Sequence, residues 1–138
     1  MKEQKPLFIF EMANNHQGNV EHGKRIIREI KKVCEQFKQF EYGFKFQYRD
    51  LDTFIHPDYK ERTDVKNVKR FQETRLTMVQ FKELLDEVRK NGFKAICTPF
   101  DENSVDNIAE QKYDFIKIAS CSFGDWPLLE KIAEKKFL

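Results

Sequence analysis

The chain has 138 residues, and its 25 basic and 23 acidic side chains leave a net charge of only +2. This balance gives no reason to expect nucleic acid or an acidic membrane surface as a partner. No apolar run approaches the ~20 residues of a membrane span, and no signal peptide is visible. The three cysteines have no metal-ligand spacing, which predicts reduced, mostly buried thiols in a cytoplasmic protein.

Strand and helix patterns alternate along the chain. Short apolar strands are predicted at 7–10, 43–48, 93–97 and 113–118. Each is followed by residues with apolar side chains at helical spacing, from 20 to 37, from 78 to 88, after 101 and after 125. The predicted N-terminal capping residues are Asn19, Thr77 with Gln80, Asp101, and Asp125 with Pro127 in the first turn. This order predicts a parallel sheet covered by helices.

The fold class is therefore α/β, with one domain over residues 1–138. Four βα units are half of a (β/α)8 TIM barrel, and we expect a fragment of a longer chain or a half that pairs with another half. An open sheet of the flavodoxin kind is the structural alternative. The polar segment 49–75 is too long for an ordinary connection, so we expect a functional or interface loop with a short helix near Val65, Val68 and Phe71.

Polar side chains gather where the predicted strands end, and this is where parallel α/β sheets bind ligands. They are Glu11, Asn14, Asn15 and His16 after the first strand, Lys45 and Gln47 on the second, Thr98 on the third, and Lys117 and Ser120 on or after the fourth. A lysine within an apolar strand is costly to bury unless an anion meets it. Two such lysines and two hydroxyls predict a phosphate or carboxylate pocket. The alternative is that both lysines face solvent.

Other interpretations stay open for single residues. Glu11 could simply pair with a lysine, and His16 could simply hold its turn by hydrogen bonds. Gly18 could supply a positive φ. His22 and His56 are expected on the surface, Trp126 is expected to pack beside Pro127, and no complete metal site can be assembled from the sequence.

Four segments together resemble the N-acetylneuraminate (sialic acid) synthase family: FEMANNHQG, GFKFQ, CTPFDENSVD and FIKIASCSFGDWPLLEKIA. They are similar, in order and over essentially the whole chain, to that family's successive strand ends. The resemblance implies a (β/α)8 barrel that condenses phosphoenolpyruvate with an open-chain N-acetyl amino-sugar aldehyde. The products would be a nonulosonic 2-keto acid and phosphate, in surface polysaccharide biosynthesis.

The resemblance also implies roles for residues. Lys45, Thr98, Lys117 and Ser120 match positions that hold phosphoenolpyruvate, Glu11 matches the catalytic acid, and Gln47 matches a residue on the sugar side. The family uses manganese or magnesium to polarise the aldehyde, and its metal ligands lie outside this chain. As partners the resemblance implies phosphoenolpyruvate and an amino sugar, with a homo-oligomer or the missing barrel half completing the site.

Two departures keep alternatives open. Met12 and Ala13 stand where the family has small residues and glycine, and Ser122 stands where the family has a sugar-site glutamate. One alternative is a non-catalytic barrel half that acts as an assembly or binding module. Another is a different phosphoenolpyruvate-using keto-sugar-acid synthase. The isolated 138-residue chain is expected to be inactive as an enzyme.

Overall fold

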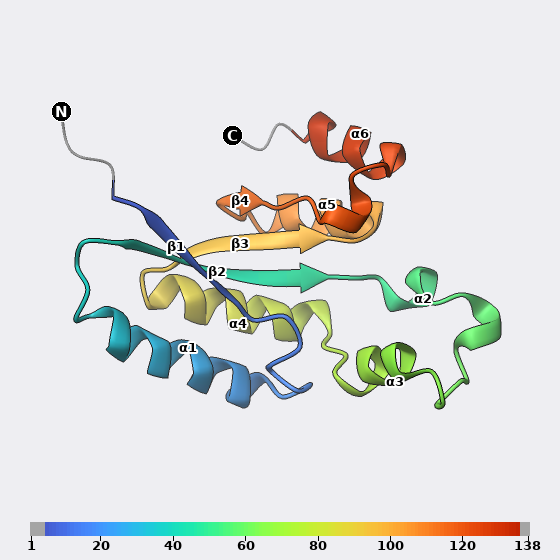
Figure 1. Cartoon of the computed structure of the whole chain (residues 1–138), viewed down its shortest axis with the longest axis horizontal. Coiled ribbons are helices and arrows are strands. Elements are labelled where there is room, and N and C mark those ends of the chain that lie inside the picture. The colour runs from blue at the N-terminus through green and yellow to red at the C-terminus, as the bar shows by residue number, and fades with distance from the viewer. Residues whose placement is uncertain (1–4, 136–138) are drawn as a thin grey trace.

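The computed structural model describes residues 5–135, which form a four-stranded parallel sheet with helices packed along it (Figure 1). The strands are β1 (Leu7–Glu11), β2 (Glu41–Tyr48), β3 (Lys94–Pro99) and β4 (Phe115–Ile116). They lie side by side in the order of the chain, β1-β2-β3-β4. A (β/α)8 barrel has this sequential order, whereas a doubly wound sheet reverses direction within it. The predicted half-barrel arrangement is confirmed, and the flavodoxin-like alternative is wrong.

The main helices begin where their capping residues predict. They are α1 (Val20–Cys34), α4 (Met78–Lys90), α5 (Glu102–Glu110) and α6 (Trp126–Glu134). The side chains of Asn19, Thr77, Asp101 and Asp125 each accept a hydrogen bond from a backbone N–H of the first turn, and Thr77 and Gln80 form the full capping box. Helix α1 packs against α4, and α5 packs against α6.

Some element ends differ from the prediction. Helix α1 ends at Cys34 and not at Phe37, because the chain turns there toward β2, and Phe37 is left 45% exposed. Strand β3 continues to Pro99, since β2 pairs with it over that whole length. Strand β4 covers only two of the six residues predicted, because within the described residues β3 is its one neighbour. Trp126 is 69% exposed, so its predicted packing role is wrong.

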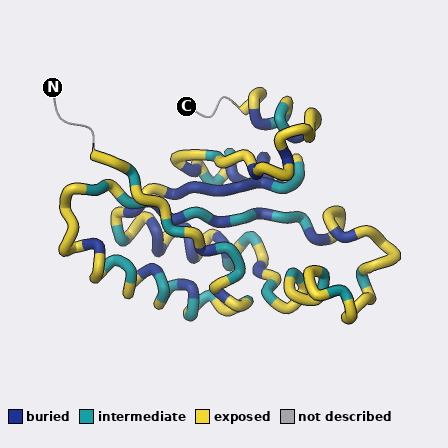
Figure 2. The backbone as a smooth tube through the Cα atoms, viewed as in Figure 1, coloured by how far each residue is buried: buried dark blue, intermediate teal, exposed yellow. Residues whose placement is uncertain are grey.

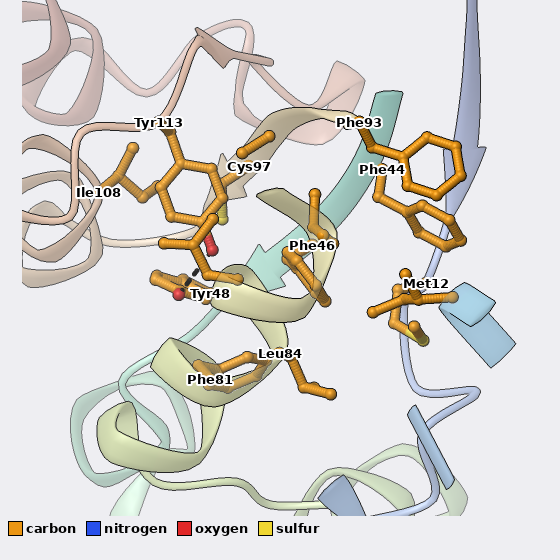
Figure 3. Packing of buried hydrophobic residues seen from close by; sticks show 14 of the residues in the cluster. Met12, Phe44, Phe46, Tyr48, Phe81, Leu84, Phe93, Cys97, Ile108 and Tyr113 are labelled. Carbon is orange, nitrogen blue, oxygen red and sulfur yellow. Dashed lines mark hydrogen bonds between the residues drawn. The ribbon is translucent and has the colours of Figure 1, made fainter. Parts of the chain in front are cut away.

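The buried core lies between the sheet and the helices (Figure 2). On β2, Phe44, Phe46 and Tyr48 are almost inaccessible, and the ring of Tyr48 lies 4.7 Å from that of Phe81 on α4. The hydroxyl of Tyr48 is hydrogen-bonded to that of Tyr113 at 2.7 Å, which satisfies both groups inside the core (Figure 3). Burial of these large apolar surfaces is the main stabilising contribution.

The opposite side of the sheet is here called the open face. It carries the side chains that alternate with the core residues: Ile9, Glu11, Lys45, Gln47, Ile96, Thr98 and Phe115. Within the described residues no helix covers this face at its margins, where Ile9 is 46% exposed and Phe115 is 42% exposed. In a closed (β/α)8 barrel the corresponding face is the interior.

The long segment after β2 contains α2 (Leu51–Phe54), a 3₁₀ turn η1 (Pro57–Tyr59) and α3 (Lys66–Glu73). The short helix predicted near Phe71 is therefore confirmed. Two bonds from the guanidinium of Arg75 to the carboxylate of Asp52, at 3.2 and 3.0 Å, close this segment on itself. The side-chain amide of Asn14 donates to the hydroxyl of Thr74, which ties the segment to the turn after β1. None of the helices within residues 5–135 is both long and apolar enough to cross a membrane.

Candidate functional site

Two rows of polar side chains cross the open face near the carboxyl ends of the strands. In the first row, Glu11 on β1 and Lys45 on β2 are register partners. The ammonium of Lys45 lies 2.6 Å from one carboxylate oxygen of Glu11, and the N–H of Ala13 donates to the other oxygen at 3.1 Å. The anion that contacts Lys45 in this structure is therefore the carboxylate of Glu11. This agrees with the alternative, stated above, that Glu11 pairs with a lysine.

The second row lies two residues further along. Gln47 on β2 is the register partner of Thr98 on β3. The N–H of Lys117 donates to the carbonyl of Cys97 at 2.9 Å, which places Lys117 beside Thr98 in the next strand. Since neighbouring strands are roughly 5 Å apart, a carboxamide, a hydroxyl and an ammonium follow one another across roughly 10 Å of the face.

Thr98 stands out in this row because its hydroxyl forms no hydrogen bond with any group in residues 5–135. The residue is 2% exposed. A buried hydroxyl without a partner costs stability, and native structures leave few of them. The Thr98 hydroxyl is therefore a buried group between Gln47 and Lys117 that makes no hydrogen bond within residues 5–135.

Lys117 and Ser120 are accessible to solvent, as Glu11 is. Lys117 is exposed, and no carboxylate in the described part of the chain lies within 4.0 Å of its ammonium. Ser120 is also exposed and begins a 3₁₀ turn, η2 (Ser120–Ser122). Ser122 is buried at the end of this turn. Its side chain carries no carboxylate, so it cannot replace the glutamate that the resemblance places at this position.

His16 belongs to the turn after β1 and not to either row. It is 3% exposed, its ring meets that of Phe81 edge-on at 5.8 Å, and its Nδ1 accepts the N–H of Gly18 at 3.1 Å. Burial, assisted by the nearby His22, lowers the pKa of His16 to about 4, so the ring is neutral at pH 7. The interpretation of His16 as a turn-holding residue is confirmed, as is the positive φ of Gly18, at 68°.

Two cavities near the end of β2 share Arg49 and Phe71 in their walls. The first measures about 330 Å³ and is lined by polar groups that include Gln47, Asn103 and Asn107. The second measures about 610 Å³ and is more aromatic. Of the polar side chains predicted at the strand ends, Gln47, Asn14 and His16 line the first cavity. Glu11, Lys45, Thr98, Lys117 and Ser120 line neither.

Sequence reasoning missed Arg49, which lines both cavities. Its guanidinium carbon lies 3.9 Å from the ring centre of Phe100 and 4.7 Å from that of Phe71, and Nη2 donates to Oε1 of Gln47 at 2.6 Å. An arginine directly after an apolar strand is a signal in the sequence. Its aromatic partners are 22 and 51 positions away, and only the fold brings them together.

The described residues do not by themselves form a metal site. Nowhere between residues 5 and 135 do three His, Cys, Asp or Glu side chains converge. Near the cavities, the carboxylate of Asp101 accepts from Ser104 and from the backbone N–H of Asp50, and Asp50 accepts from Asn103. A manganese or magnesium ion therefore remains a prediction whose ligands are not found in this part of the chain.

Comparison with known proteins agrees with this arrangement of strand ends. The chain is 31% identical over 137 residues to the N-acetylneuraminate-9-phosphate synthase of Mus musculus, and the match covers 94% of the chain but 37% of that protein. The chain thus spans little more than a third of this curated relative.

Two crystal structures resemble this structure closely. A protein from Chromobacterium violaceum, described as a spore coat polysaccharide biosynthesis protein E, is 65% identical with a TM-score of 0.90, over 94% of this chain and 38% of that one. An N-acetylneuraminic acid (sialic acid) synthetase from Leptospira borgpetersenii serovar Hardjo-bovis, in complex with citrate, is 25% identical with a TM-score of 0.74, over 97% of this chain and 43% of that one. Residues 42–137 match the family model described as the NeuB family, and the chain therefore belongs to the NeuB family.

Proposed function

We propose that this chain supplies the first four βα units of a sialic-acid-type synthase. The reaction would condense phosphoenolpyruvate with the aldehyde of an N-acetyl amino sugar, consume one water, and release phosphate and a nonulosonic 2-keto acid. The relatives named as synthases and the polysaccharide-biosynthesis relative support this role. The new bond would form between C3 of phosphoenolpyruvate and the aldehyde carbon of the sugar.

The observation that carries the proposal is the Thr98 hydroxyl, which has no hydrogen-bond partner in the described part of the chain and lies beside Lys117 on the next strand. The hydroxyl can donate to a phosphate or carboxylate oxygen, and the adjacent ammonium can neutralise the same anion. Such a row would hold a phosphate ester or a carboxylate, and phosphoenolpyruvate carries both groups. Ser120, exposed at the start of η2, would add a second hydroxyl.

Glu11 and Lys45 would act as a pair whose partners change during the reaction. In this structure the ammonium of Lys45 is neutralised by Glu11 at 2.6 Å. An arriving dianion would draw Lys45 toward itself and leave the Glu11 carboxylate free to move a proton at the forming bond. Gln47, which lines the first cavity, would then contact the sugar. A divalent metal, held by residues outside this part of the chain, would polarise the aldehyde.

The test is a chimera in which this chain replaces the matched segment of the Chromobacterium violaceum protein, to which it is 65% identical. Phosphate release from phosphoenolpyruvate is followed with manganese and N-acetylmannosamine. Lys45→Met and Lys117→Met keep the apolar stem but remove the charge, and each should raise the KM for phosphoenolpyruvate at least about tenfold. Lys90→Met, on the exposed side of α4, is the matched control and should change neither constant.

If both lysine variants keep the KM and kcat of the unmodified chimera, the assignment of Lys45 and Lys117 to phosphoenolpyruvate binding is wrong.

A second candidate, a non-catalytic assembly module, is favoured by the exposed apolar side chains of Ile9 and Phe115 on the open face. Phosphate release above blank by the 138-residue chain alone would reject that candidate. A panel of other aldehyde acceptors, assayed with the chimera, would detect a different keto-sugar-acid synthase.

A further inference from the structure

The turn after β1 holds an alanine in a conformation that favours glycine. Ala13 has a φ of 42°, on the left-handed side where the Cβ of an L-residue crowds the next carbonyl oxygen. The resemblance places glycine at this position, so the backbone shape is kept although the side chain differs. A strained residue of this kind persists only where its surroundings fix it, and such residues cluster at functional sites.

The chain is fixed on both sides of Ala13. The side chain of Met12 has no exposed surface and lies in the core (Figure 3), and its backbone N–H donates to the carbonyl of Lys45 at 2.9 Å. On the other side, the side-chain amide of Asn14 donates to the hydroxyl of Thr74. Met12 is thus tied to β2, and Asn14 is tied to the far end of the long segment that follows β2. The residue between them has little freedom to relax.

The peptide between Met12 and Ala13 makes two hydrogen bonds that depend on its orientation. Its N–H, which belongs to Ala13, donates to Oε1 of Glu11 at 3.1 Å, and its carbonyl accepts from the backbone N–H of Asn15 at 2.9 Å. In a planar trans peptide the N–H and the carbonyl point in opposite directions. Turning the peptide over would bring the φ of Ala13 back to the negative side, but it would break both bonds at once. The positive φ is therefore the geometry that aims this N–H at Glu11.

The carboxylate of Glu11 is consequently held by two donors of different kinds. Oε2 contacts the ammonium of Lys45 at 2.6 Å, and Oε1 accepts from the backbone of Ala13. Lys45 has a long, flexible side chain that can turn to another anion, whereas a backbone N–H anchored on both sides cannot move away. The side chain of Glu11 is 38% exposed, so without a fixed donor it would be free to take up other rotamers.

We infer that the backbone N–H of Ala13 is a positioning group for Glu11, which keeps the carboxylate in place when Lys45 turns to the substrate anion. The inference rests on the proposed condensation, in which these two partners separate and Glu11 moves a proton at the forming bond. Ala13 acts only through Glu11 and not by contact with either substrate. A carboxylate that keeps its position after its counter-ion has left requires no reorientation before proton transfer.

The first experiment follows the amide proton of residue 13 by NMR in the 138-residue chain, and so it does not depend on the reaction. Lys45→Met imitates the departure of the ammonium, and Glu11→Met removes the acceptor. We expect this proton to exchange with water at least about tenfold more slowly in wild type and in Lys45→Met than in Glu11→Met. Lys117→Met removes an exposed cation further along the same sheet and, as the control, should match wild type.

Ala13→Gly separates the backbone from the side chain. Glycine adopts a positive φ without strain and keeps the N–H, so the slow exchange should be retained while the melting temperature rises by about 2–4 °C. A fall in the melting temperature would contradict the strained geometry on which the inference stands.

The second experiment removes this N–H from the chimera and measures the reaction. L-Lactate in place of Ala13, introduced by nonsense suppression, converts the amide to an ester and keeps the methyl group. We expect kcat to fall at least about tenfold and the KM for phosphoenolpyruvate to change less than about twofold, because the N–H contacts Glu11 and not the substrate. The same ester at Ala109 removes a backbone N–H from α5; it should lower the melting temperature and leave kcat unchanged.

Three results would overturn the inference: fast exchange at residue 13 in wild type, loss of the slow exchange in Lys45→Met, or an unchanged kcat with the ester at Ala13. An equal fall in kcat with both esters would also overturn it, since the effect would then be one of folding alone. Absent phosphate release by the unmodified chimera with every acceptor would count against the proposed function. In that case the exchange measurements on the 138-residue chain would still decide whether the N–H of Ala13 holds Glu11.

Discussion

Replacing Thr98 by valine should stabilise the fold and weaken phosphoenolpyruvate binding at the same time. Valine has nearly the same shape as threonine, so the substitution removes the buried Oγ1, for which residues 5–135 offer no partner, without opening a cavity. A buried unsatisfied hydroxyl costs about 1–3 kcal/mol. Taking the lower end, the free energy of unfolding should rise by about 1 kcal/mol, which moves the urea midpoint up by about 0.5 M.

The matched control is Thr74→Val. The Thr74 hydroxyl donates to the carbonyl of Arg70 at 2.7 Å and accepts from the side-chain amide of Asn14, so its removal takes this acceptor from Asn14 and leaves the Arg70 carbonyl with the backbone N–H of Thr74 alone. Its urea midpoint should therefore fall by a similar amount. The two variants make the same chemical change in opposite hydrogen-bonding environments, and opposite signs are expected.

Two assays decide the case. Urea unfolding of the 138-residue chain gives the stability of each variant, and calorimetric titration of phosphoenolpyruvate into the chimera gives the affinity. A lower midpoint for Thr98→Val would show that its hydroxyl is satisfied within the fold. Unchanged phosphoenolpyruvate affinity would remove Thr98 from the binding site, even if the stability rises as expected.

Two further predictions concern the turn after β1. The folded-state pKa of His16, about 4, lies below the unfolded value of 6.5, so the unfolded chain binds more protons between these pH values and stability falls as the pH drops through that window. Urea unfolding should show a loss of about 2 kcal/mol between pH 7 and pH 5, and His16→Asn should largely abolish it; an equally steep loss in the variant would contradict the assignment. Gly18→Ala places a Cβ 2.9 Å from the carbonyl oxygen of Glu73 at a φ of 68°, whereas Gly92→Ala has a φ of 76° and open space around it. By thermal melting both should be destabilised, Gly92→Ala by about 1 kcal/mol and Gly18→Ala by clearly more, and equal losses would argue against a close contact at Gly18.

The order of elements could be predicted from the sequence because it depends on local signals. The alternation of GFKFQY correctly placed Phe44 and Phe46 on one face and Lys45 and Gln47 on the other. The capping side chains of Asn19 and Asp125 marked helix starts, because a cap bonds to the backbone a few residues ahead. These features do not depend on distant parts of the chain.

The rest depends on pairing between segments far apart in sequence. The length of β4 is set by what lies beside it, and the contact between Glu11 and Lys45 is set by the register of β1 on β2. Whether the Thr98 hydroxyl finds a hydrogen-bond partner within residues 5–135 depends on all the segments that pack around it, so no local sequence pattern predicts it. The surroundings of Arg49 are likewise assembled from two later segments that supply Phe71 and Phe100.

The alternation along β2 has an evolutionary consequence. Phe44, Phe46 and Tyr48 contribute to the core through one side of the strand, while Lys45 and Gln47 contribute nothing to it. A mutation at an open-face position can therefore change what the strand end recognises at little cost in folding free energy. Such a strand lets ligand preference diverge among descendants of one ancestor while the scaffold is inherited intact.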